Sequence, residues 1–202
     1  LIEGDVEDGS EAIKKYSQDY SIFKVTPEII VFPKNSEDIK KIVKFVNSKR
    51  EAGLVNISIT PRAAGTCMSG GPLNTSIILD VTRYMSGVLS VEKKDLGEQK
   101  SPTGYNFKIA GIAKVLPGTY YRDFEKETLK KDLIMPCYPA SRELCAVGGM
   151  VGNNGAGEKT LKYGQNKDFV ESLKVVLADG EEYEVKKLKK EELEAKILED
   201  NL

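Results

Sequence analysis

Two glycine-rich segments carry the residues best suited to hold a ligand through the protein backbone. The first, residues 61–72, directly follows a predicted strand and consists mostly of small side chains. Backbone N–H groups in such a segment can approach a ligand closely, and successive exposed amides form a nest that suits a pyrophosphate. Thr66 and Ser69 add hydroxyl donors, and Arg62 adds a positive charge. A purely structural turn is the alternative interpretation of this segment.

Two familiar phosphate-binding motifs nearly match the first segment and fail. Gly65 and Gly70 have the spacing of a P-loop, but Gly71 and Pro72 stand where Lys and Ser or Thr are needed. No G-x-G-x-x-G sequence occurs anywhere in the chain, so the Rossmann dinucleotide turn is also missing.

The second segment, residues 145–157, is even richer in glycine. Five of the ten residues 148–157 are glycine, although each glycine costs roughly 0.5–1 kcal/mol in a regular element. The run is typical of backbone packed tightly against a ligand, or of a helix start that points N–H groups at phosphate; a flexible loop is the alternative. Two such segments, about 80 residues apart, predict one long ligand held from two sides, for which a dinucleotide is the natural candidate.

The elements around the first segment form a predicted βαβ unit. An apolar strand over residues 28–32 is followed by a helix that Asn35 or Ser36 caps. The helix has an apolar stripe, and a second strand follows at residues 56–60. The stripe consists of Ile39, Ile42, Val43 and Val46. A further strand at residues 77–80 follows the glycine-rich segment.

The second half of the chain is predicted to be more antiparallel. Residues 87–115 read as strands at 88–91 and 107–110 with a polar hairpin between them, and a helix follows over about 119–131. A strand at 171–177 turns through Asp179 and Gly180 into residues 183–185, and residues 189–202 form a charged helix. We therefore expect an α/β (α+β) fold of two packed subdomains, about 1–84 and about 85–202.

Composition excludes several classes of function. The 202 residues have a net charge of −1, which gives no basic surplus for nucleic acid. There is no histidine, so His-based zinc sites and catalytic triads are excluded, and the three cysteines form no CxxC pair. No apolar run reaches the roughly 20 residues of a membrane span. A cytoplasmic protein is expected, with any membrane association being peripheral and through an electron-transfer partner.

The motifs, taken together, resemble a known family. They are Thr26–Pro33 with Glu37–Ile39, Pro61–Thr66 with Ser69–Gly71, Pro117–Gly118, Pro139–Ser141, Cys145–Gly149, Asn153–Gly157, Leu161–Gly164 and Val176–Gly180. In this order they resemble the FAD-binding domain of the vanillyl-alcohol oxidase and para-cresol methylhydroxylase superfamily, and within it the glycolate oxidase and D-lactate dehydrogenase branch. The resemblance covers roughly residues 16–185. It implies two α/β subdomains with FAD between them.

The resemblance also implies which residues bind FAD. The pyrophosphate would lie against the first segment, at Arg62, Ala63, Ala64, Gly65, Thr66, Ser69 and Gly70. The ribityl chain and the flavin would lie against Pro139, Ala140, Ser141, Cys145, Gly148, Gly149, Gly152, Asn153 and Gly157. Tyr163 would support this second segment or contact FAD directly. Because the chain has no histidine, non-covalent FAD is expected.

The activity implied by the resemblance is oxidation of a 2-hydroxy acid, such as D-lactate or glycolate, to a 2-oxo acid. Relatives continue with a closing strand and a substrate-capping domain, which we expect this chain to lack. The catalytic base and the carboxylate-binding groups are expected in that domain, so we predict no catalytic and no metal-binding residue here and no turnover by these 202 residues alone. Three alternatives stay open: a non-catalytic FAD-binding subunit, another flavin enzyme such as a cell-wall precursor reductase, and a nucleotide-binding module without flavin.

Overall fold

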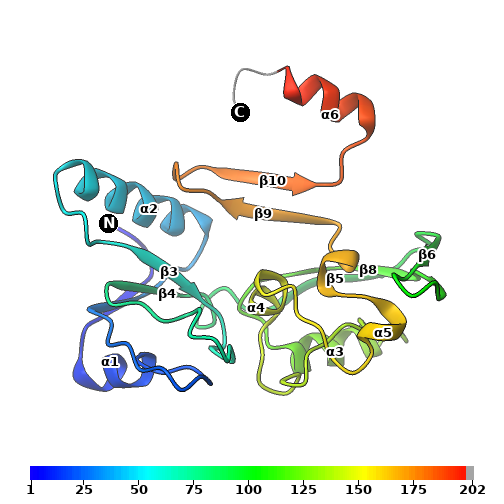
Figure 1. The fold of residues 1–202 in the computed structure, drawn as a ribbon, viewed down its shortest axis with the longest axis horizontal. Coiled ribbons are helices and arrows are strands. Elements are labelled where there is room, and N and C mark those ends of the chain that lie inside the picture. The colour runs from blue at the N-terminus through cyan, green and yellow to red at the C-terminus, as the bar shows by residue number, and fades with distance from the viewer. Residues whose placement is uncertain (199–202) are drawn as a thin grey trace.

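A four-stranded sheet forms the centre of the N-terminal part in the computed structural model of the protein, which describes residues 1–198 (Figure 1). Its strand order is β1 (Asp5–Glu7), β2 (Ile29–Phe32), β4 (Ile77–Asp80) and β3 (Ile59–Arg62). β2 and β3 run parallel to β4, which lies between them, and β1 pairs antiparallel with the outer edge of β2.

One helix covers each face of this sheet, because side chains alternate along the strands. Ile30, Phe32 and Ile78 point to one face and pack with Tyr16 of α1 (Ser10–Tyr16). The strand residues whose side chains point to the other face pack with Ile42 and Val46 of α2 (Ser36–Glu51). As expected, Asn35 caps α2, and its side chain accepts a hydrogen bond of 3.0 Å from the amide of Asp38.

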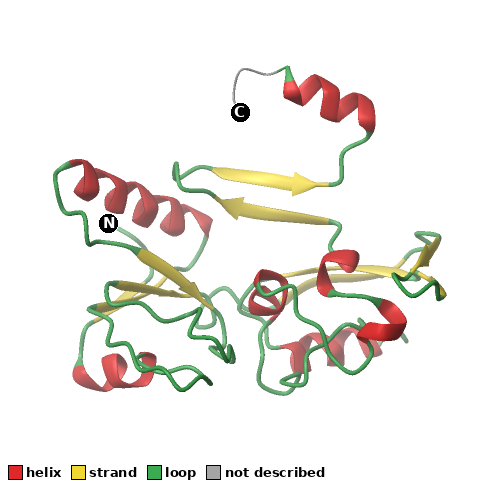
Figure 2. Ribbon diagram, in the orientation of Figure 1, coloured by secondary structure: helices red, strands yellow, loops and turns green. Residues whose placement is uncertain are grey.

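The C-terminal part is built on two-stranded sheets and short helices (Figure 2). β5 (Val88–Lys93) pairs antiparallel with β8 (Gly111–Val115), and the hairpin of β6 (Glu98–Lys100) and β7 (Asn106–Lys108) lies between them in sequence. Then come α3 (Tyr121–Leu129), α4 (Val147–Gly152), α5 (Thr160–Tyr163) and a 3-10 turn at Asn166–Phe169. Their core contains Tyr121, Phe124, Tyr138, Val147 and Met150.

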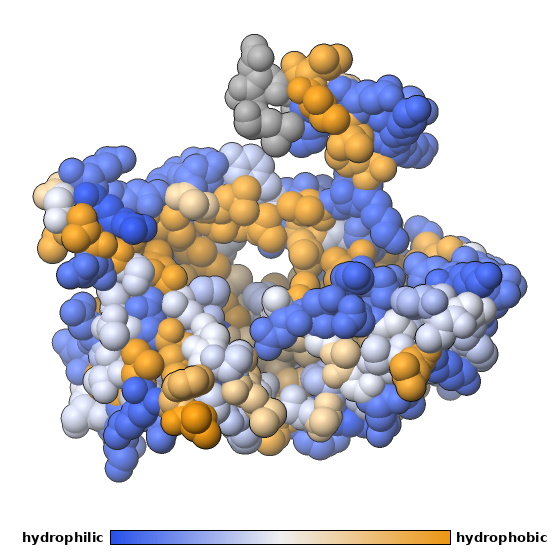
Figure 3. All heavy atoms as spheres, in the orientation of Figure 1, coloured by the Kyte–Doolittle hydropathy of each residue, from blue (hydrophilic) through white to orange (hydrophobic). Residues whose placement is uncertain are grey.

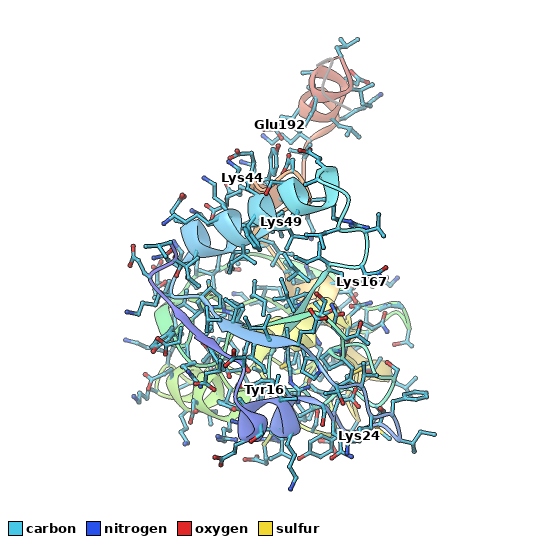
Figure 4. All side chains as sticks on the ribbon, turned by 90° about the vertical axis from the view of Figure 1, so that its left-hand side faces the viewer. Tyr16, Lys24, Lys44, Lys49, Lys167 and Glu192 are labelled. Carbon is cyan, nitrogen blue, oxygen red and sulfur yellow. The ribbon has the colours of Figure 1, made fainter. Side chains whose placement is uncertain are left out.

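The hairpin of β9 (Ser172–Val176) and β10 (Glu182–Lys186) returns to the N-terminal part before α6 (Lys190–Ile197). Its tip lies against α2. The Asn47 amide donates to the Ala178 carbonyl at 2.6 Å. Lys44, which is labelled on α2 in Figure 4, pairs with Glu181 at 2.6 Å. The turn at Asp179 and Gly180 therefore connects the two parts by a contact in addition to the chain itself.

The elements differ from the sequence-based expectation at their ends and at one sheet edge. The strand expected at 56–60 is β3 at 59–62, and β5 pairs with residues 111–115 rather than with 107–110. β1 was not expected at all. The helix expected over 189–202 is present as α6, and its last four residues lie outside the described residues.

Two glycines let backbone segments cross at close range, Gly118 between the two parts and Gly148 within the C-terminal part. Gly118 donates its amide to the Met85 carbonyl at 2.8 Å, and a Cβ placed on Gly118 would overlap the Val81 carbonyl oxygen. A Cβ on Gly148 would lie 2.8 Å from the carbonyl oxygen of Pro117. These obstacles are backbone atoms or lie close to the backbone, so a side chain at either glycine would push the segments apart.

Gly118→Ala should therefore lower the free energy of unfolding by about 1–3 kcal/mol, the usual range for overpacking. Gly152→Ala is the matched control, because no atom lies within 4 Å of its added Cβ. The control should leave stability unchanged or raise it by up to about 1 kcal/mol through helix propensity. Urea unfolding followed by circular dichroism measures both variants. Equal stability of the two would contradict the close crossing at Gly118.

Candidate functional site

The two glycine-rich segments, which we call the first loop (residues 61–72) and the second loop (residues 145–157), meet in the structure. A Cβ on Gly149 of α4 would lie 3.4 Å from the Cβ of Ala63, which is ordinary van der Waals contact. Residues about 80 positions apart in sequence thus border one site.

The first loop presents a run of amides without partners. Within the described residues, the N–H groups of Ala64, Gly65 and Thr66 donate to no protein acceptor. Gly65 is buried and has φ of +68°, the left-handed conformation that turns consecutive amides toward one point. Successive free amides around such a turn suit an anionic group such as a phosphate.

The back of the first loop is held by the segment that follows α1. The Gly70 amide donates to the Asp19 carboxylate at 3.0 Å, and the Tyr20 amide donates to the Cys67 carbonyl at 3.1 Å. Arg62 is 9% exposed and donates to the Gln18 carbonyl at 2.8 Å. Arg62 and Gly70 therefore make protein contacts, whereas the amides of 64–66 remain available.

The second loop presents a bare helix surface. Gly149 and Gly152 are three residues apart on α4 and so share a face. A Cβ on Gly152 would meet no atom within 4 Å. The amides at the start of α4 are already used, since Val147 donates to the Thr119 carbonyl and Gly148 to the Pro117 carbonyl. The helix start expected to face phosphate is thus anchored to protein, and the open surface is its side.

The remaining expected residues surround the second loop in different ways. Gly157 crosses the Tyr138 backbone so closely that a Cβ would overlap the carbonyl oxygen. Cys145 is buried, and its amide donates to the Ser141 carbonyl at 2.8 Å. Tyr163 packs with two aromatic rings of the β6–β7 hairpin. Pro139, Ala140 and Ser141 lie in the chain leading to Cys145, and Asn153 is exposed just after α4.

Asn166 is a structural residue that sequence reasoning missed. It is completely buried, and its amide donates to the carbonyls of Cys137 at 3.0 Å and Gly155 at 2.6 Å. Its side-chain oxygen has no partner among the described residues. Asn166 thereby ties the end of the second loop to the chain before Pro139. No spacing pattern in the sequence identifies it.

A cavity of about 2020 Å³ opens beside the second loop, between the two parts of the molecule (Figure 3). Apolar side chains of α2, β5, β8 and β9 line much of it, and its wall includes Gly148, Gly152 and Tyr163. It exceeds the roughly 300–1,000 Å³ of a typical small-molecule pocket. The cavity therefore has room for an extended ligand beside Gly152.

The chemistry of the three cysteines differs with their surroundings. The Ser69 hydroxyl, 3.0 Å from the sulfur, lowers the pKa of the Cys67 thiol. Burial raises the pKa of Cys137 to about 12 and also raises that of Cys145. Among residues 1–198, no cluster of three or more acidic or cysteine side chains could hold a metal ion. In the same range, no helix is both long and apolar enough to cross a bilayer.

Known proteins are similar to this chain in sequence. The family described as "FAD binding domain" matches residues 27–186. A D-lactate dehydrogenase from Archaeoglobus fulgidus is 32% identical over 75% of this chain and 29% of its own length. A glycolate oxidase subunit from Bacillus subtilis is 27% identical over 79% of this chain and 30% of its own length. A D-2-hydroxyglutarate dehydrogenase from Escherichia coli is 27% identical over 82% of this chain and 14% of its own length. The chain thus spans less than a third of these relatives.

Solved structures give the same fold. 6-Hydroxy-D-nicotine oxidase from Arthrobacter nicotinovorans matches with a TM-score of 0.69 and 20% identity, over 92% of this chain and 36% of its own. An alkyldihydroxyacetonephosphate synthase matches with a TM-score of 0.68 and 20% identity, over 91% of this chain and 32% of its own.

Cys67 should be the first thiol to react with iodoacetamide near pH 8. Its lowered pKa gives it a larger fraction of the reactive thiolate than a thiol of ordinary pKa. Cys137 and Cys145 are buried and have raised pKa values, so they stay protonated. Mass spectrometry of tryptic peptides after short labelling reads out the order, and Cys67→Ser is the control. Labelling of Cys137 before Cys67 in the folded protein would contradict these surroundings.

Proposed function

The chain belongs to the FAD binding domain family, and from this membership we propose that the protein oxidises a 2-hydroxy acid with FAD held between the first and second loops. The expected resemblance to the vanillyl-alcohol oxidase and para-cresol methylhydroxylase superfamily is confirmed by the family match and the relatives. The expected two-subdomain type of FAD-binding fold agrees with its structural neighbours.

The proposed reaction follows the relatives' names. They are a glycolate oxidase subunit and dehydrogenases of D-lactate and D-2-hydroxyglutarate, whose named substrates are all 2-hydroxy acids. Since this chain spans only a minor part of each relative, the reaction is proposed for the whole protein. We place the catalytic base and the carboxylate-binding groups in chain that this sequence does not contain.

The single observation that carries the FAD site is the run of free amides at residues 64–66 beside the bare face of α4. The pyrophosphate would lie against the amides of Ala64, Gly65 and Thr66, with the Thr66 and Ser69 hydroxyls nearby. The rest of the cofactor would pass Gly149 and Gly152 toward the apolar cavity. The other expected residues, from Pro139 to Gly157, support this path.

The bound FAD supplies the group that accepts a hydride from the substrate carbon. This chain's residues supply binding and orientation. The amides of the first loop would donate hydrogen bonds to the pyrophosphate, and the bare α4 face would let a planar ring approach the backbone. The absence of histidine from the sequence supports non-covalent binding.

Gly152→Val tests the path of the cofactor. Since no atom lies within 4 Å of the added Cβ, valine should leave the melting temperature of the free protein nearly unchanged. The same side chain would occupy the space beside α4, so FAD affinity should fall at least tenfold. Fluorescence titration measures the affinity, and Ala156→Val, at an exposed position of the same loop, is the control. Wild-type affinity in Gly152→Val would place the cofactor elsewhere.

The proposed reaction is tested on the purified whole protein. We expect a yellow protein that reduces a dye acceptor with D-lactate, glycolate or D-2-hydroxyglutarate, and saturating FAD at about 100 times Kd should stabilise it by about 2.7 kcal/mol. A yellow but inert protein would indicate a non-catalytic FAD-binding subunit. Reduction of the bound flavin by NADPH would indicate another flavin enzyme. A colourless protein stabilised by ATP but not by FAD would contradict the flavin site itself.

A further inference from the structure

The Arg62 side chain lies behind the turn at Gly65, where its guanidinium can shape the first loop. It is the last residue of β3 and is buried. One terminal nitrogen donates to the Gln18 carbonyl at 2.8 Å, and the other lies 3.5 Å from the Tyr16 carbonyl. Both acceptors belong to the segment at the end of α1, so the guanidinium fork faces the protein interior.

Gly65 rests on the flat face of this guanidinium. A Cβ on Gly65 would lie 2.7 Å from the Arg62 Cζ and 2.8 Å from its Nε. Similar distances to several atoms of one planar group mean that the backbone lies over the plane and not beside its edge. The left-handed turn at Gly65, which directs the free amides of residues 64–66, is therefore supported from below by a rigid planar surface.

The support is itself fixed by a buried stack. The Arg62 guanidinium lies 5.1 Å from the centre of the Tyr16 ring. The Tyr16 hydroxyl donates to the Asp80 carboxylate at 2.8 Å, and the other oxygen of Asp80 accepts from the amide and the hydroxyl of Thr82. Figure 4 shows Tyr16 on the side of α1 that faces the sheet. Asp80 is also the register partner of Arg62 on β4, so it provides a buried counter-charge.

The far end of the loop is held by the same segment. The Asp19 carboxylate accepts the Gly70 amide at 3.0 Å and the Ser21 amide at 2.8 Å, and the Tyr20 amide reaches the Cys67 carbonyl. Residues 16–20 therefore contact the loop at Gly65 through Arg62 and at Gly70 through Asp19. The free amides lie between these two supports.

We propose that Arg62 is a positioning residue that shapes the first loop for the pyrophosphate, and that it does not contact the phosphates. This inference rests on the proposed FAD site and deepens it. An arginine that bound phosphate directly would act through its charge, which a lysine partly replaces. A planar support with two donors in fixed directions cannot be replaced by lysine.

Arg62→Lys and Arg62→Met distinguish these roles. Both variants should bind FAD and ADP ten- to a hundredfold more weakly than wild type, and riboflavin, which has no phosphate, within threefold of wild type. Lys14→Met is the control, because Lys14 is an exposed cation on α1, and it should change none of the three affinities. Near wild-type FAD affinity in Arg62→Lys with a loss in Arg62→Met would show a charge contact and overturn the proposal. An equal loss of riboflavin affinity would also overturn it.

The dependence of FAD affinity on ionic strength gives a second readout. Removing a buried support should leave that dependence unchanged, because salt screens buried charges weakly. A flatter dependence in Arg62→Met would overturn the proposal. Failure of the wild-type protein to bind FAD would refute the proposed site, whereas full FAD affinity in both Arg62 variants would refute this inference alone.

Two variants of Asp19 test the support of the loop at Gly70 without changing Arg62. Asp19→Asn keeps an oxygen acceptor for the Gly70 amide and should bind FAD within threefold of wild type. Asp19→Ala removes the acceptor and should weaken FAD and ADP but not riboflavin. Tighter FAD binding by Asp19→Ala would mean that the carboxylate only repels phosphate. It would overturn the proposal that residues 16–20 hold the first loop in place.

Discussion

The approach of one backbone segment to another without intervening side chains is the constraint on which this structure depends. At Gly118 the two parts of the chain cross with backbone atoms in contact, and at Gly148 the start of α4 packs on the Pro117 backbone within the C-terminal part. These crossings set α4 beside the end of β3, so that Ala63 and Gly149 touch. A ligand site between the two parts follows from this packing, since neither loop alone presents both the free amides and the bare helix face.

Much of the fold was predictable because its local signals agree. The Asn35 cap and the apolar stripe with Ile42 and Val46 define α2, and the nearly continuous apolar runs at 29–32 and 77–80 define strands of a sheet buried on both faces. The missed elements had no local signal. β1 contains the acidic residues Asp5 and Glu7 and forms because it pairs with β2. Likewise, the pairing of β5 with 111–115 is set by the inserted β6–β7 hairpin, a tertiary effect that alternation alone does not specify.

The site was less predictable than the fold because glycine has two roles that look identical in sequence. Gly148 and Gly157 are small because the protein's own backbone lies against them, whereas Gly152 faces open space. The spacing in residues 145–157 contains no mark that separates these cases. Arg62 shows the same limit for a charged residue: its type and position suggested phosphate, while its geometry directs the guanidinium to the carbonyls of residues 16 and 18. Only the three-dimensional packing reveals which groups remain available.

The β9–β10 hairpin lines the cavity between the parts and contacts α2 at its tip. The ion pair of Lys44 with Glu181 is exposed, and such pairs contribute only about 0–1 kcal/mol. The hairpin tip is better fixed by shape, because Gly180 has φ of +77° and packs against the Lys44 side chain, and by the 2.6 Å hydrogen bond from Asn47 to the Ala178 carbonyl. A two-stranded hairpin has little stability of its own, so its position depends on the contact of its tip with α2. The hairpin and the second loop therefore line the same cavity beside the proposed FAD site.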